Sequence, residues 1–514
     1  MLEKVDLTKS MTKAEYKAKM PMLEARIGEL QRQLKALNIP VMIVFEGFGA
    51  SGKGLQIGEL IQSLDPRGFT VYAVKEESKE EHFHPFLWRF WTKTPEKGRI
   101  AIFDGSWYRK VLIERFDKKT KIKEISDAYQ SICSFERQLA QDGCIIIKLL
   151  LDIDQKEQKS RLKKLKSSRE TAWRVSQGDL ERNARYKEYS QMMEEMLQIT
   201  DTDFAPWTII EATDRRFATV KIYSVIIKSL EEQLDKVIKK KAKEKAAEAI
   251  EEFAEEGNIT AEAVRTTVDE KSLGESVLSR ADLTLSLSKA EYKRRLKELQ
   301  KKMRLLHGEI YRRRIPVILG FEGWDAGGKG GAIKRLTAKM DPRGFVVHPT
   351  ASPNDIEKAH HYLWRFWSAV PKAGHIAVFD RTWYGRVMVE RIEGFCTKLE
   401  WQRAYKEIND MERDFVNAGA IVMKFWMQID KEEQERRFKA RQENPQKQWK
   451  ITEEDWRNRD KWEQYEEAVN EMLIRTSTKS APWIVVEGND KYYARIKVLE
   501  SVVQAVEDRI RDLK

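Results

Sequence analysis

Apolar residues gather in two runs that occupy matching places in the chain. Residues 39–45 (Ile-Pro-Val-Met-Ile-Val-Phe) and 315–321 (Ile-Pro-Val-Ile-Leu-Gly-Phe) each lead into a glycine-rich loop, and a helix-like segment follows each loop. Short apolar runs with such boundaries predict buried strands. A third run, 376–380, predicts another buried strand, and this one ends in Asp380. The pattern predicts an α/β fold with parallel sheets flanked by helices.

The runs belong to an internal repeat. Phe45 and Phe321 lie 276 residues apart, and the same separation relates Asp65–Phe69 to Asp341–Phe345 and Leu87–Trp91 to Leu363–Trp367. No insertion or deletion interrupts the register from Asp6 to Trp207, so both copies are expected to share one fold. Each copy spans a little over 200 residues, enough to bury its own core.

The repeat predicts two complete domains. We place the first at 1–235 and the second at 282–514, with a linker at 236–281. The linker is rich in Lys, Glu and Ala before it turns polar, which predicts an exposed helix running into a polar connection.

Both loops follow the G-x-x-x-x-G-K pattern of a phosphate-binding loop. In such a loop, backbone N–H groups and the positive end of the next helix bind phosphate oxygens. In the second copy, residues 323–330, we expect Gly323, Gly327, Gly328 and Gly330 to bind phosphate and Lys329 to stabilise the transferred group. The alternative is a glycine-rich turn with a surface lysine.

A carboxylate inside the second loop points to a metal. The Ser or Thr that usually follows the loop lysine and ligates Mg²⁺ is Gly330 here. Because Mg²⁺ prefers one or two carboxylates with phosphate oxygens and water, we assign Asp325 and Asp380 to Mg²⁺. Asp380 ends a strand that is expected beside the loop. The alternative for Asp325 is a helix cap.

Arginines follow Asp380 closely. We expect Arg381, Arg386 and Arg391 to clamp phosphates and neutralise developing charge. The competing interpretation is a structural ion pair between one of these arginines and Glu390.

Basic residues are dense over 431–461, which predicts a mobile lid that closes over the site and excludes water. We expect phosphate contacts from Arg436, Arg437, Arg441 and Lys450. Interleaved acids leave open a charged pair of amphipathic helices with no such role.

Composition narrows the setting. The formal net charge is +12, which together with the loops favours an anionic substrate. Three cysteines cannot form a disulfide framework, and the chain shows no signal-peptide core and no run of roughly 20 apolar residues. We expect a soluble protein of the reducing cytoplasm that binds neither membrane nor nucleic acid.

Four segments together resemble the polyphosphate kinase 2 family: residues 321–331, 341–345, 361–365 and 379–391. The resemblance covers nearly all of both copies and is similar to the family's two-domain class. It implies a thymidylate-kinase-like P-loop fold with a helical lid, and it implies Mg²⁺. It further implies ADP formation from AMP with inorganic polyphosphate as phosphoryl donor, and a homo-oligomer is compatible with it.

The first copy departs from the family pattern at the positions assigned to chemistry. Gly49 stands at the position of Asp325 and Gly105 at the position of Arg381. We therefore predict little or no catalysis in the first copy. Two rivals stay open at this point: an ATP-dependent nucleotide kinase, and a polyphosphate- or nucleic-acid-binding protein without turnover.

Overall fold

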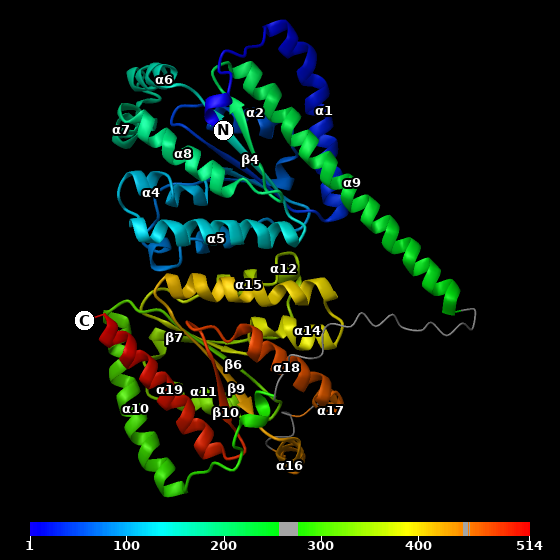
Figure 1. The fold of residues 1–514 in the computed structure, drawn as a ribbon, viewed down its shortest axis with the longest axis vertical. Helices are drawn as coiled ribbons and strands as arrows, with labels where there is room; N and C mark the ends of the chain where they lie inside the picture. Colours follow the sequence, from blue (N-terminus) through cyan, green and yellow to red (C-terminus); the bar gives the residue numbers. More distant parts are fainter. Residues whose placement is uncertain (256–275, 446–450, 452, 514) are drawn as a thin grey trace. The chain divides into compact units, whose positions relative to one another are not determined.

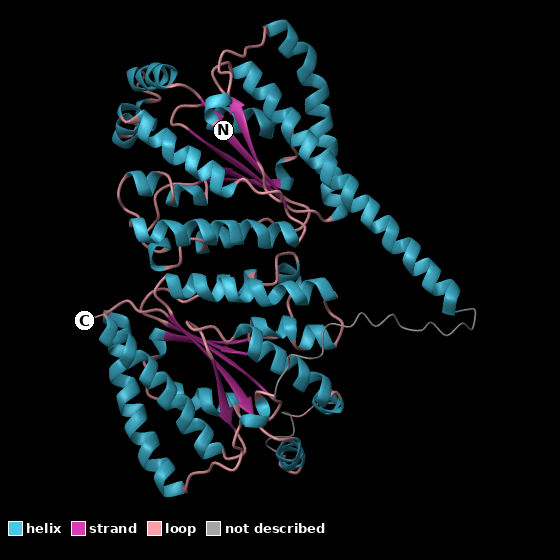
Figure 2. Ribbon diagram, viewed as in Figure 1, coloured by secondary structure: helices cyan, strands magenta, loops and turns pink. Residues whose placement is uncertain are grey.

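Each half of the chain builds a five-stranded parallel sheet with helices on both faces (Figure 2). The computed structural model describes residues 1–255, 276–445, 451 and 453–513, and for 240–255, 454 and 455 it describes the backbone only. In the described part of the chain, no helix is both long and apolar enough to cross a membrane.

The sheet of the first half has the order β2-β3-β1-β4-β5. Its strands are β1 Val41–Gly47, β2 Phe69–Ala73, β3 Ile100–Asp104, β4 Ile145–Asp152 and β5 Trp207–Glu211. Every residue of β1 and β4 is buried, as expected for central strands covered on both faces.

The sheet of the second half repeats this order as β7-β8-β6-β9-β10. Its strands are β6 Val317–Gly323, β7 Phe345–Pro349, β8 Ile376–Asp380, β9 Ile421–Gln428 and β10 Trp483–Glu487. Phe321 of β6 pairs in parallel with Asp380 of β8, so the two strand ends meet at the carboxyl edge of the sheet. The predicted duplicated α/β fold is confirmed.

Helices of the first half cover the two faces of its sheet (Figure 1). The long helices α1 and α9 pack on each other at one face, and α5 and α8 lie at the other. The helices are α1 Lys13–Leu37, α2 Lys53–Gln62, α3 Trp88–Trp91, α4 Ile113–Phe116, α5 Ile122–Gln141, α6 Gln155–Ser167, α7 Gln177–Ala184, α8 Tyr186–Thr200 and α9 Arg215–Glu255.

The second half repeats the arrangement, with α10 and α19 on one face and α15 and α18 on the other. Its helices are α10 Lys289–Arg312, α11 Lys329–Thr337, α12 Asp355–Lys358, α13 Trp364–Ser368, α14 Val389–Ile392, α15 Lys398–Asn417, α16 Lys431–Gln442, α17 Glu453–Asp460, α18 Trp462–Thr476 and α19 Lys491–Asp512.

The chain divides into two compact units that exchange short segments. Asp355–His361 belongs to the first unit, and Glu77–Trp88 belongs to the second. Helix α9 continues to Glu255, past the predicted domain end at 235. The remainder of the predicted linker up to residue 275 lies outside the described residues, so the boundaries at 235 and 282 stay predictions.

A buried ion pair joins each sheet to the helical layer that contains α5 and α8 in the first unit and α15 and α18 in the second. In the second unit, Lys424 of β9 donates to Glu412 of α15 at 2.7 Å, to the hydroxyl of Tyr384 at 2.9 Å and to the carbonyl of Thr476 at 2.6 Å. Glu412 also accepts from the indole of Trp383 at 3.0 Å.

The pair is fully buried, and this burial shifts the pKa of both groups. Burial lowers the pKa of Lys424 and raises the pKa of Glu412, while the contact between the opposite charges offsets that effect. Lys148 and Glu136 form the same pair at 2.9 Å in the first unit. The network anchors the segment that follows Asp380, because Trp383 and Tyr384 belong to it.

Replacing Lys424 with Met is expected to lower the free energy of unfolding of the second unit by about 3–5 kcal/mol, because Glu412 stays buried without its partner. Urea unfolding of the full chain measures the change. Lys479→Met at an exposed position is the control, and adding Glu412→Leu to Lys424→Met should recover part of the loss. An unchanged midpoint for Lys424→Met would contradict the proposed anchoring.

Candidate active site

The loop after β6 has a backbone that needs glycine. Gly323 has φ 141° and Gly328 has φ 109°, both in the region that side chains disfavour. A Cβ on Gly323 would lie 2.6 Å from the carbonyl oxygen of Met427 in β9. Helix α11 begins at Lys329, so the loop presents its amides at a helix N-terminus.

Lys329 lies inside the curve of the loop. Its ammonium donates to the carbonyl of Gly323 at 2.5 Å and to that of Trp324 at 3.4 Å. Lys53 makes the same contacts, with Gly47 at 3.0 Å and Phe48 at 3.3 Å, in the first unit. The loop lysine is thus held in place equally in both units.

Glu322 is a buried acid beneath the loop that sequence reasoning missed. Its carboxylate accepts from the backbone N–H of Thr382 at 2.6 Å and from the Thr382 hydroxyl at 2.8 Å. Burial raises the pKa of Glu322, and nearby Lys329 opposes that rise. Glu322 therefore fixes the segment after β8 against the loop. Its signal was present in the sequence, since Glu46 precedes the first loop in the same way.

The loop acid and the arginine after β8 meet. Asp325 accepts from Arg381 at 3.3 Å and from the side-chain amide of Asn458 in α17 at 3.4 Å. Asp380 lies half-buried at the end of β8, and no hydrogen bond or ion pair to its carboxylate occurs among the described residues. Asp325 thus lies within the loop, and Asp380 lies opposite Phe321, two residues before the loop, while their role in binding a metal stays a prediction.

The first unit lacks the contact between Asp325 and Arg381, and the side chain of Asp179 occupies the place of the Asp325 carboxylate. A Cβ on Gly49 would lie 2.9 Å from the Oδ1 of Asp179 in α7, so the space of an Asp325-like side chain is already occupied. Gly105 has φ 74°, close to the φ of 65° at Arg381. For a non-glycine residue this conformation costs about 1–2 kcal/mol. The second unit bears that strain and the first does not.

Arg386 and Arg391 are both engaged in ion pairs. Arg386 contacts Glu390 at 2.7 Å, which identifies the partner of Glu390 that the sequence left open. Arg391 contacts Glu471 of α18 at 2.6 Å, and the first unit has the same ion pair between Arg115 and Glu195 at 2.8 Å. Because Arg391 has this structural counterpart, its expected phosphate contact stays a prediction.

Arg437 of α16 holds the loop from outside. Its guanidinium donates to the carbonyl of Ala326 at 2.9 Å and to that of Gly488 at 2.6 Å, and it pairs with Glu433 at 2.5 Å. Arg161 makes the equivalent contacts in the first unit, with the carbonyls of Ala50 at 3.4 Å and Ala212 at 2.8 Å. Arg437 therefore shapes the loop, a role the sequence did not indicate, and its contact with phosphate stays a prediction.

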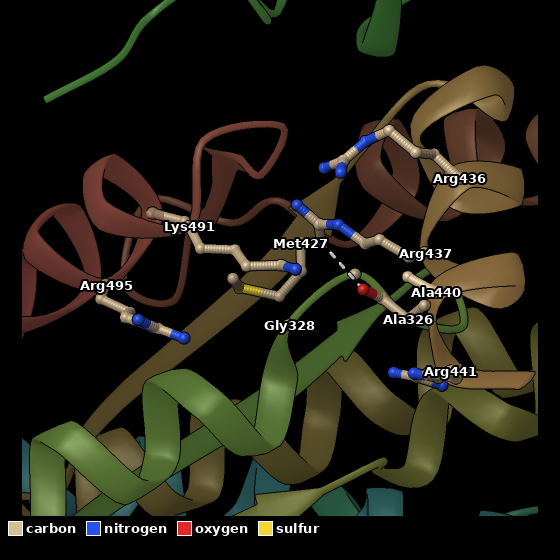
Figure 3. A pocket seen from close by; sticks show the side chains of 11 residues that line it. Ala326, Gly328, Met427, Arg436, Arg437, Ala440, Arg441, Lys491 and Arg495 are labelled. Atoms are coloured by element: carbon tan, nitrogen blue, oxygen red, sulfur yellow. Dashed lines mark hydrogen bonds between the residues drawn. The ribbon is translucent and has the colours of Figure 1, made fainter. Parts of the chain in front are cut away.

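A cationic pocket opens beside the loop between α16 and α19 (Figure 3). It has a volume of about 170 Å³, and Lys491 and Arg495 of α19 face Arg436 and Arg437 of α16 across it. The partial burial of the Lys491 ammonium, helped by nearby Arg437, lowers the pKa of Lys491 to about 8. Arg441 also lines the pocket.

Most of these cations are specific to the second unit. The first unit has Thr219 at the position of Arg495, Ser160 at that of Arg436 and Leu165 at that of Arg441. Sequence reasoning found Arg436 and Arg441 but missed Lys491 and Arg495. Arg495 had a signal in the difference between the copies, whereas Lys491 corresponds to the equally basic Arg215 and had no such signal.

The described residues of the predicted lid form two helices joined by non-helical residues. Helix α16 and helix α17 lie within 431–461, and Arg459 of α17 contacts Glu435 of α16 at 2.7 Å. Trp462, at the start of α18, stacks on Trp324 of the loop with ring centroids 3.6 Å apart. This stack was also missed, although Phe48 and Tyr186 stack in the first unit. Lys450 lies outside the described residues.

A metal would find two carboxylates here. Within the described parts of the chain, no cluster of three or more His, Cys, Asp or Glu residues gathers. Asp325 and Asp380 match a hard cation whose other ligands are phosphate oxygens and water. The residues present therefore fit Mg²⁺.

The central strand, the glycine-bent loop with its lysine and the acid on the neighbouring strand define a P-loop phosphotransferase fold. The family model for polyphosphate kinase 2 matches residues 10–238 and again 286–514. The chain belongs to the polyphosphate kinase 2 family.

Two relatives that match nearly the whole chain carry the name polyphosphate:AMP phosphotransferase. A polyphosphate:AMP phosphotransferase of Pseudomonas aeruginosa is 38% identical, with 99% of each chain covered. Another from Acinetobacter johnsonii is 33% identical, over 97% of this chain and 98% of the relative. A crystal structure from Pseudomonas aeruginosa described as a polyphosphate kinase 2 matches with a TM-score of 0.85 at 36% identity, over 100% of both chains.

Proposed function

We propose that the second unit transfers the terminal phosphoryl group of inorganic polyphosphate to AMP and so forms ADP. Relatives that match over nearly the whole chain and are named for this reaction support the choice of donor and acceptor. A cationic pocket next to the phosphate loop suits a polyanionic donor better than a single nucleotide phosphate.

One observation supports placing the proposed reaction in the second unit. Asp325 and Arg381 contact each other there, and both positions are glycine in the first unit. A carboxylate and a guanidinium that adjoin the phosphate loop are the groups phosphoryl transfer needs for a metal and for charge neutralisation. The first unit is expected to contribute little or no catalysis.

The residues divide the work as follows. The backbone amides of Gly327, Gly328 and Gly330 bind the phosphoryl oxygens. The ammonium of Lys329 leaves the loop carbonyls to which it donates and binds the transferred phosphoryl group instead. Arg381 and Arg386 neutralise charge that develops during in-line transfer.

Asp325 and Asp380 would hold Mg²⁺, which, when bound, withdraws charge from the phosphoryl oxygens. Closure of the lid over 431–461 excludes water and prevents hydrolysis of the donor. Three free cysteines fit a reducing cytoplasm, and a homo-oligomer stays a prediction.

The test compares two donors on the full chain. With Mg²⁺ present, AMP and polyphosphate should yield ADP, measured by chromatography. AMP and ATP should yield far less product per unit time. Activity with ATP alone would establish an ATP-dependent nucleotide kinase, and binding of polyphosphate without any turnover would establish a binding protein.

The two loop lysines form a matched pair of variants. Lys329→Ala should lower kcat by about 100–1,000-fold, because one preorganised charge at the transferred group is lost. Lys53→Ala, the same change in the first unit, should leave kcat within about twofold. Equal losses in both variants would show that the first unit also turns over.

Asp325→Ala should raise the Mg²⁺ concentration needed for half-maximal activity and lower kcat by about 100-fold or more, because the loop then has no carboxylate ligand. Binding of polyphosphate, followed by a filter assay, should stay within about threefold because the amides are unchanged. Asp512→Ala, at the exposed last residue of α19, is the control. Unchanged Mg²⁺ dependence would remove Asp325 from the metal site.

The lowered pKa of Lys491 predicts that the KM for polyphosphate depends on pH. Its ammonium attracts a polyanion only when protonated, so the KM for polyphosphate should rise as the pH increases through about 8. Lys491→Arg keeps the charge and should flatten this rise between pH 7 and 9. The same slope in both proteins would mean that Lys491 does not contact the donor.

A further inference from the structure

A stripe of four lysines runs along α6 of the first unit, and the mechanism uses none of them. Lys156, Lys159, Lys163 and Lys166 are spaced three, four and three residues apart, which places them on one face of the helix. From the first to the last, the stripe is about 15 Å long at the rise of an α-helix. We call these four residues the α6 lysine stripe.

The stripe borders an open groove. The groove has a volume of about 800 Å³, and Leu180, Asn183 and Ala184 of α7 line it opposite all four lysines. Leu162 lies at its floor and is buried. The groove is therefore a formed concavity with a basic wall and a largely uncharged opposite wall.

No acid balances the stripe. All four lysines are exposed, and none forms an ion pair with a described residue. The other basic face of α6 is different, because Arg161 pairs with Glu157 at 2.6 Å and donates to the loop carbonyl of Ser51 at 2.9 Å. Lysines at these spacings repel one another, so a bound polyanion would stabilise the helix.

The second unit lacks the stripe. At the positions of Lys156 and Lys159 its helix α16 has Glu432 and Glu435, and Glu435 pairs with Lys439 at 2.7 Å. Helix α6 carries six basic residues and one acid, whereas α16 carries five basic residues and three acids. The basic groove is thus a property of the unit that lost the Asp325 carboxylate.

We propose that the α6 lysine stripe binds inorganic polyphosphate and tethers a long donor to the protein, outside the catalytic loop. The proposal rests on the proposed function for the identity of the donor. A row of flexible ammonium groups recognises a repeating phosphate chain by charge and needs no base or sugar contact. The groove has no described aromatic lining residue on which a nucleobase would stack.

A tether acts only on donors long enough to occupy it and still present an end to the second unit. For such chains, binding at the stripe raises the effective concentration of donor at the active site. Short polyphosphate cannot gain in this way. The stripe therefore makes the protein favour long chains without taking part in the chemistry.

The experiment changes Lys156 and Lys159 to Glu in the full chain, which reproduces the residues of the second unit. The KM for polyphosphate of about 100 phosphates should rise at least about tenfold, while the KM for tripolyphosphate and kcat with either donor stay within about twofold. Direct binding of the long chain should weaken, and the steepness of its salt dependence should fall.

Lys17→Glu with Lys19→Glu on exposed positions of α1 is the matched control, since it changes the net charge equally. An equal rise of the long-chain KM in this control would show a general charge effect and overturn the proposal. So would an equal loss with tripolyphosphate, or single-stranded RNA that displaces the long chain at equal phosphate concentration. If the parent chain fails to phosphorylate AMP, the proposed function is wrong. The binding measurement then still tests whether the α6 lysine stripe binds long polyphosphate.

Discussion

The buried contact between Lys424 and Glu412 is the constraint on which the second unit depends, and Lys148 with Glu136 repeats it in the first. Two charges removed from water are tolerated only when each finds its partners. Here those partners include Trp383 and Tyr384, which follow the strand that ends in Asp380. The pair thereby ties the second helical layer to the sheet and fixes the segment that the chemistry needs.

The two units share this buried ion pair and the loop framework, and they differ in the side chains that surround the loop. Both keep the loop lysine, the buried acid before the loop and an arginine, on α6 or α16, that donates to loop carbonyls. The second unit adds Asp325 and Arg381 and accepts backbone strain at Arg381. The first unit instead has four exposed lysines along one face of α6. Under the two proposals made above, duplication separates catalysis from the binding of a long substrate.

Sequence patterns were sufficient for the strands, the loop and the duplication, because burial and glycine geometry act locally. The sequence placed Asp380 beside the loop from the ends of two neighbouring strands, but it did not predict the contact between Asp325 and Arg381. Arg391 and Arg437 show where such reasoning stops. Their residue type favoured phosphate contacts, but Glu471 and the carbonyls of Ala326 and Gly488 lie beside them in the fold. Pairs so distant in sequence leave no periodic signal.

By itself the sequence determined the repeated α/β architecture, the family and the glycine-rich loop with its lysine, since each depends on residues close together in the chain. Only the tertiary structure decided which cations are held by carboxylates and which face a pocket, as Lys491 and Arg495 do. It also decided that four lysines of α6 border a groove. The physical reason is that electrostatic partners are chosen by distance in space, which the folded chain alone defines.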